Sequence, residues 1–165
     1  MAENWGAIRA NLATVLAAIN GTAPYETTVG TVDTFFRTWN EVNNLSYPII
    51  GISAAGADTE YKHTNTFRVV HKLYLWMHIK GGPITDPKNA TGHDLRVDAN
   101  LIAEMDRLID DVIYALSLDQ KRGGYATSTT ITHWETDEAD VEGRRGTISA
   151  RMDIDIVYFR TTGKS

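Results

Sequence analysis

Two stretches of the chain carry apolar residues at the spacing of an amphipathic helix. The first ends at Ile19, and Asn20-Gly21 followed by Pro24 predicts its termination, because Asn and Gly tolerate a left-handed cap and Pro prevents the helix from resuming. Its apolar positions are Ile8, Leu12, Val15, Leu16 and Ile19.

The second stretch, Leu95 to Leu118, has a wider apolar stripe, which predicts a helix lying flat on a sheet. The stripe consists of Leu101, Ile102, Met105, Leu108, Ile109, Val112, Ile113 and Leu116. We expect the charged residues on the solvent side of this helix, namely Glu104, Asp106, Arg107, Asp110 and Asp111.

The segment Phe67–Lys80 alternates apolar and polar residues, which is typical of a strand with one buried and one solvated face. His71 is the one interruption of its apolar side, and we expect it in the core or near a sheet edge. Tyr74 and Trp76 fall on the polar side.

The segment Thr147–Phe159 alternates without a break and places Asp153 and Asp155 on its polar side. Shorter strands are predicted within 29–39, over 48–52 and over 127–134, where β-branched and aromatic residues gather. We expect 54–65 to form an exposed connection or a long hairpin tip, and 136–145 to form an acidic connection.

The order helix, strands, helix, strands predicts one α+β domain over residues 1–165. Two helices would pack on one face of a largely antiparallel four- to five-stranded sheet. The length of 165 residues agrees with a single domain that buries a real core.

Composition removes several classes of function. The chain has no Cys, which excludes disulfides, thiol nucleophiles and Cys-based metal sites. Its net charge of −5 gives no global attraction for nucleic acid or anionic lipid. The sequence contains no long apolar run and no basic leader, so we expect no membrane association and retention in the compartment of synthesis.

Catalytic and metal-binding patterns are weak. His71 and His78 lie seven positions apart on one strand and so point to opposite faces. Asp153 and Asp155 could hold Mg²⁺ or Ca²⁺ only with a third oxygen ligand, and a solvated strand face explains them as well. No phosphate-binding loop or serine elbow is present. We therefore predict no catalytic residue, metal or cofactor, with an unrecognised small-molecule binder or hydrolase as an alternative.

The pair Tyr74 and Trp76 is the most distinctive surface feature. Basic residues share its strand face (Arg68, Lys72 and Lys80), so a platform for single-stranded nucleic acid is one interpretation. The acidic balance of the chain favours the other interpretation, a protein–protein interface, where aromatic residues flanked by Arg are enriched.

A run of acidic residues leads to a basic pair before the last strand. It comprises Glu135, Asp137, Glu138, Asp140 and Glu142, followed by Arg144 and Arg145. The run is either a solvated loop or a charged segment that lines a channel or contacts a neighbouring subunit, together with Asp153 and Asp155. Exposed strand edges offer a further route to self-association.

The order of features resembles the tail terminator, or tail completion, proteins of long-tailed bacteriophages, over most of the chain. The matching features are the N-terminal helix, Thr-Val-Gly-Thr-Val at 28–32, Tyr-Pro-Ile-Ile-Gly-Ile at 47–52, the strand Phe67–Lys80, Ile-Asp-Asp-Val-Ile-Tyr-Ala-Leu at 109–116, Ile-Thr-His-Trp-Glu-Thr-Asp at 131–137 and the closing strand to Val-Tyr-Phe-Arg at 157–160. The loops 54–65 and 81–94 have no counterpart, so surface residues do not transfer.

This resemblance implies a virion structural protein of the tail or neck, assembled in the cytoplasm of a bacterial host and without enzymatic activity. Its copies would form a ring, hexameric in the family, that caps the tail tube, stops its polymerisation and joins a head-completion or neck protein. Genomic DNA would pass through the ring without specific binding, helped by an acidic inner wall. The alternative is another head–tail joining protein or a tail tube protein.

Overall fold

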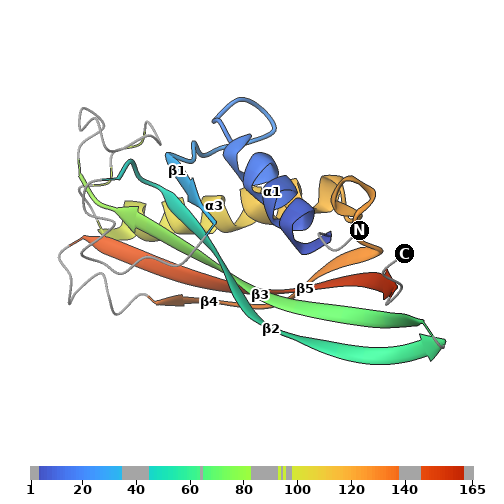
Figure 1. Cartoon of the computed structure of the whole chain (residues 1–165). Coiled ribbons are helices and arrows are strands. Elements are labelled where there is room, and N and C mark those ends of the chain that lie inside the picture. The colour runs from blue at the N-terminus through green and yellow to red at the C-terminus, as the bar shows by residue number, and fades with distance from the viewer. Residues whose placement is uncertain are drawn as a thin grey trace.

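A five-stranded sheet carries both described helices on one of its faces (Figure 1). The computed structural model describes residues 4–34, 45–63, 65–82, 93, 95, 98–137 and 146–161. Along the chain the elements are α1 (Asn4–Ala17), β1 (Thr31–Asp33), β2 (Ile49–His63), β3 (Thr66–Lys80), α3 (Asp98–Leu118), the short 3₁₀ helix η1 (Arg122–Gly124), β4 (Ser128–Asp137) and β5 (Thr147–Thr161). The α+β architecture predicted from the hydrophobic pattern is confirmed.

The strand order is β1-β2-β3-β5-β4, so the last strand along the chain lies inside the sheet. β2, β3, β5 and β4 pair antiparallel, whereas β1 pairs in parallel with residues Ile49 to Gly51 of β2. The sheet is therefore mixed, and largely antiparallel as predicted.

The core lies between the helices and the sheet, where side chains from both layers interdigitate. The predicted apolar side of β5 is buried along its length, from Ile148 to Tyr158. In α1 the apolar stripe is buried at Ile8, Leu12 and Leu16, and Ile19, which follows the end of α1, is buried as well. The apolar pattern with a period of two residues thus predicted the buried face of the strand correctly, and the pattern with a period of 3.6 residues predicted that of the helix.

β2 is longer than predicted. Residues 54–63, expected to be an exposed connection or a hairpin tip, are exposed but continue the strand and pair with β3 as far as His63. The interpretation as a hairpin tip is therefore correct, and the interpretation as an irregular connection is wrong. Ala and Gly have low β-propensity, but pairing with the strong β-formers of β3 keeps them in the sheet. We call residues 54–63 of β2 with 66–72 of β3 the arm; it projects beyond α1 (Figure 1).

The boundaries of other elements also differ. β4 continues to Asp137, so Glu135 and Asp137 belong to a strand, although the sequence placed Asp137 in a connection. The predicted strand within 29–39 corresponds to β1 at 31–33 in the described part, and positions 35–39 lie outside it.

Two acidic residues of α3 that we expected in solvent are buried. Glu104 is fully buried; its Oε2 accepts from Arg107 Nη1 at 2.8 Å and lies 2.7 Å from His93 Nδ1. Burial raises the pKa of Glu104, while His93 and Arg107 act in the opposite direction. Asp111 is 5% exposed and receives the backbone N–H groups of Glu26 and Thr27.

Asp111 therefore anchors the segment after α1 to the second helix. Its Oδ2 lies 2.7 Å from Thr27 N and 2.6 Å from Thr27 Oγ1, and Thr27 is fully buried. At the C-terminal end of α3, the buried Arg122 donates to the backbone oxygen of Leu116 at 2.5 Å, which satisfies a carbonyl near the helix end.

Candidate protein-interaction surface

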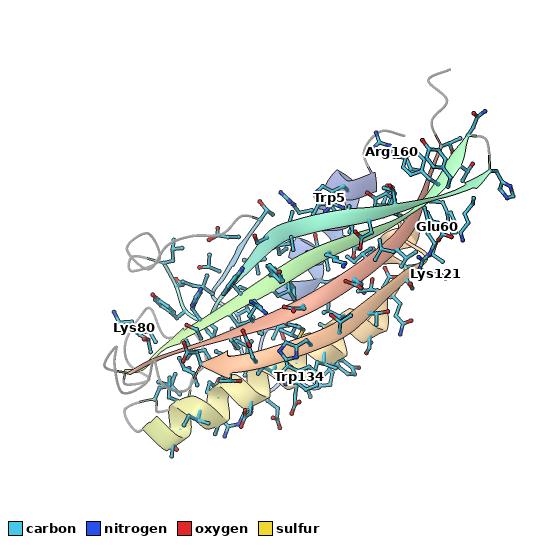
Figure 2. The ribbon with its side chains drawn as sticks, turned by 90° about the horizontal axis from the view of Figure 1, so that it is seen from below. Trp5, Glu60, Lys80, Lys121, Trp134 and Arg160 are labelled. Carbon is cyan, nitrogen blue, oxygen red and sulfur yellow. The ribbon has the colours of Figure 1, made fainter. Side chains whose placement is uncertain are left out.

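The sheet face turned away from α1 and α3 is covered by no element of the described chain. Figure 2 views the molecule from below, with the ribbons of β2, β3, β5 and β4 running across this open face and the helices behind them. Alternation along each strand sends every second side chain to it. Its residues therefore come from two consecutive strand pairs, β2 with β3 and β4 with β5, which the helix α3 separates in the sequence.

The side chain of Arg151, in β5, is the centre of the open face. Its Nε donates to Asp153 Oδ1 at 3.0 Å, and its Nη2 lies 3.6 Å from Glu135 Oε1 of β4. Its guanidinium carbon stands 4.8 Å from the ring centroid of Tyr74 and 6.0 Å from that of Trp76, both in β3. We call these five residues the open-face cluster.

The register of the sheet assembles the open-face cluster. Arg151 is directly opposite Trp76 on one side and Glu135 on the other, and Asp153 is opposite Tyr74. Cross-strand partners have Cβ atoms about 5 Å apart, so long and aromatic side chains there must meet. The two rings also contact each other edge to face, with centroids 6.1 Å apart at an interplanar angle of 77°.

The charges on this face are largely paired. Lys72 of β3 forms an ion pair with Asp58 of β2 at 3.1 Å and is opposite Asp155 in the register. The hydrogen bond to Asp58, followed by the charge of Asp58, raises the pKa of Lys72. Acidic residues remain in excess at the β4 side, where Glu135 and Asp137 share the face with Asp153. The surface therefore carries both positive and negative charges in its middle and mainly negative charges at one border.

Two histidines complete the surface. His78 Nδ1 and Ser149 Oγ are hydrogen-bonded at 3.1 Å, and His133 Nε2 lies 3.7 Å from Glu135 Oε2. His71 is on the helix side, stacked on Trp5 with ring centroids 3.7 Å apart, so the prediction that His71 and His78 point to opposite faces is confirmed. Within the described ranges, no group of His, Asp and Glu side chains is arranged to hold a metal ion.

The structure brings together six of the residues singled out from the sequence on the open face, namely Tyr74, Trp76, Glu135, Asp137, Asp153 and Asp155. The remaining five, Glu138, Asp140, Glu142, Arg144 and Arg145, lie outside the described residues. The central role of Arg151 was not predicted from the sequence. Its signal was present, since Arg151 is the basic residue on the polar side of the last strand.

The geometry favours a protein partner over stacked bases. The guanidinium of Arg151 lies over the Tyr74 ring, so the ring face that a base would occupy is already in use. Asp153 and Glu135 stand beside it and would repel phosphates. Arg, Tyr and Trp are the residue types that contribute most to protein–protein interfaces, and here they are in contact with one another.

Comparison of the sequence with models of known protein families and with curated proteins gives no match. Among the described helices, none has both the length and the apolar character that crossing a bilayer requires. Any function assigned to the chain therefore depends on the surface itself and on the order of features along the sequence.

Proposed function

We propose that this protein is a structural subunit of a bacteriophage tail, of the tail terminator kind. Copies of the chain form a ring that caps the tail tube, stops its polymerisation and provides the attachment for a head-completion or neck protein. The observation that carries the proposal is the open-face cluster around Arg151, an aromatic and charged surface on an uncovered sheet. The resemblance in the order of features supplies the class of assembly.

The open-face cluster supports docking rather than chemistry. Arg151 is already held by two carboxylates and two rings, so it is suited to pack against a partner without losing conformational freedom on binding. The face is built from four strands and presents aromatic and charged side chains together, a combination that protein–protein contacts use.

The acidic border of the open face supports the passage of DNA through such a ring. Glu135 and Asp137 in β4 lie on the same face as Asp153 and Asp155 in β5. If this border lines the channel, its carboxylates repel phosphates and the genome slides without sticking. The alternative site for the same residues is the contact between subunits.

Electron microscopy of purified components tests the function. The purified protein is added to tail tube protein during polymerisation, and tube lengths are measured in negative stain. We expect shorter tubes that end in a ring. Tubes of unchanged length contradict a terminator, and long tubes formed by the protein alone identify it as a tube protein.

Deletion of the gene in its source distinguishes the neighbouring roles. Overlong tails without heads are the result expected for a terminator, whereas tails of normal length detached from heads indicate a neck adaptor. Complementation with Arg151→Ala then tests the surface, with Tyr125→Ala as the control because Tyr125 is 50% exposed and lies outside the open face. We expect Arg151→Ala to fail and Tyr125→Ala to restore infectious particles.

A further inference from the structure

In the part of the chain that the structure describes, the two borders of the sheet have unpaired backbone edges. β1 pairs only with Ile49 to Gly51, so within the described chain β2 has no neighbour on its outer side from Ile52 to His63. β4 forms the other border, and among the described strands it pairs only with β5. Rows of free N–H and C=O groups on a long exposed strand are a template for a further strand.

The strand directions make these two edges complementary. Across the sheet, β2, β3, β5 and β4 alternate in direction. β4 of one copy is therefore antiparallel to β2 of a second copy that has the same orientation, and the alternation continues from one sheet into the next. Because the two edges are different, such a contact is head-to-tail and closes into a ring when the rotation allows.

From these observations we propose that β4 of one subunit pairs antiparallel with the outer part of β2, Ile52–His63, of a second copy of this chain. The inference rests on the proposed function in assuming an assembly of copies, and it names the contact that joins them. The arm supplies the necessary length: β4 has 10 residues, and the free edge of β2 extends beyond the part that β1 occupies.

The side chains favour one register. Trp134 of β4 is 50% exposed. It pairs with Met152, so its side chain is on the face of the sheet that carries the helices. Ala57 of β2 is on the same face, opposite His71, and is exposed. Placing Trp134 against Ala57 covers the indole with a small residue, sets His133 opposite Asp58 on the open face and keeps β4 along the free part of β2.

Both edges contain a register shift, between Ala54 and Gly56 in β2 and between Ile131 and His133 in β4. Bulges of this kind hinder pairing with arbitrary strands. In the register above, the two shifts lie at opposite ends of the contact, so regular pairing extends over Gly56–Asp58 of β2 and His133–Glu135 of β4.

Cross-linking tests the contact, and the absence of native Cys makes the chain suited to it. The variants Asp58→Cys and His133→Cys are made singly and together, and each is oxidised mildly at concentrations where light scattering detects assembly. We expect a heterodimer when the two single variants are mixed, a ladder of multimers from the double variant, and no covalent product from either single variant alone. The double variant Asp58→Cys/Tyr125→Cys is the control and should give no ladder.

Other outcomes separate this inference from the proposed function. Covalent dimers from His133→Cys alone, or from Asp58→Cys alone, show two-fold pairing of like edges and overturn the inference. Assembly without a link between positions 58 and 133 also overturns it and leaves the proposed function standing. A protein that stays monomeric even with tube protein present overturns the proposed function itself.

Substitution at the edge gives a second measurement. We expect Trp134→Lys to raise the concentration required for assembly by about tenfold, since a large apolar side chain leaves the contact. Tyr125→Lys is the matched control, because Tyr125 has the same 50% exposure and lies outside β4. An equal effect of the two substitutions contradicts the role of the β4 edge.

Discussion

Replacement of Asp111 is predicted to destabilise the fold far more than replacement of its neighbour Asp110. The Asp111 carboxylate is 5% exposed and accepts two backbone N–H groups and one hydroxyl from Glu26 and Thr27. Asp110, the next residue on the same helix, is exposed. Asp111→Asn and Asp110→Asn remove the same charge from the same helix, but only the first affects a buried carboxylate that accepts these hydrogen bonds.

The expected magnitude follows from the hydrogen bonds that each substitution removes. A hydrogen bond to a charged group contributes about 1.5–3 kcal/mol, and a buried donor without a partner costs about 1–3 kcal/mol. Asp111→Ala removes the acceptor from buried Thr27 altogether, so we expect a decrease of about 4 kcal/mol in the free energy of unfolding. Asp111→Asn retains one acceptor oxygen and should decrease it by about 2 kcal/mol. Asp110→Asn should remain within about 0.5 kcal/mol.

Urea denaturation followed by circular dichroism measures these differences, with unchanged slopes showing that the unfolded states are comparable. In thermal melts, about 4 kcal/mol corresponds to a decrease of roughly 8–16 °C for a chain of this size. If Asp111→Asn and Asp110→Asn have the same stability, the anchoring of the 26–27 segment by α3 is refuted.

Three further predictions concern buried groups and close backbone approaches. Burial, reinforced by the charge of Arg9, lowers the pKa of His71, so protonation of His71 favours the unfolded state and the free energy of unfolding decreases as pH falls below about 6.5. His71→Phe should make this decrease smaller in denaturation measured between pH 7.5 and 5. Burial raises the pKa of Glu104, so the protonated form is favoured in the folded state. The free energy of unfolding of the native protein, relative to that of Glu104→Gln, should therefore fall as pH rises from about 4.5. The same pH dependence of stability in both proteins would contradict this. Gly30→Ala should destabilise by more than about 2 kcal/mol, because its Cβ would meet backbone atoms at 2.7 Å, whereas Gly6→Ala has open space in a helix and should stabilise by up to about 1 kcal/mol in the same melts.

The regular elements were predictable where one periodicity dominates. The alternation in β3 and β5 and the stripe in α1 predicted the correct layers, because burial on one face leaves a direct trace in the sequence. The long β2 was not predictable in the same way. Apart from Tyr61, its outer part consists of small and polar residues exposed on both sides, and pairing with β3, rather than burial, makes it a strand.

The burial of two acidic residues in α3 was indicated by their positions in the sequence, although their charge suggested exposure. Glu104 and Asp111 follow the three- and four-residue steps of the core, in line with Leu101, Leu108 and Ala115. Assigning charged residues to solvent by type was wrong for these two, because each finds hydrogen-bond or ion-pair partners that no hydrophobic pattern reveals.

The candidate surface was predictable residue by residue but not as a unit. Tyr74 and Trp76 stood out as aromatics on a polar strand face, and Asp153 as an acid on another. Their meeting around Arg151 depends on β3 and β5 being neighbours in a given register, and that information is held by the fold rather than by either segment.

The position of β5 has a consequence for biosynthesis. This strand is the last along the described chain, yet it lies between β3 and β4 and pairs with both. Until Thr147–Thr161 has been translated, β3 lacks its partner on one side and β4 has no place in the sheet. A nascent chain therefore cannot complete the sheet before its last strand is made. In the assembly proposed above, pairing of copies through β4 would wait for completed polypeptides.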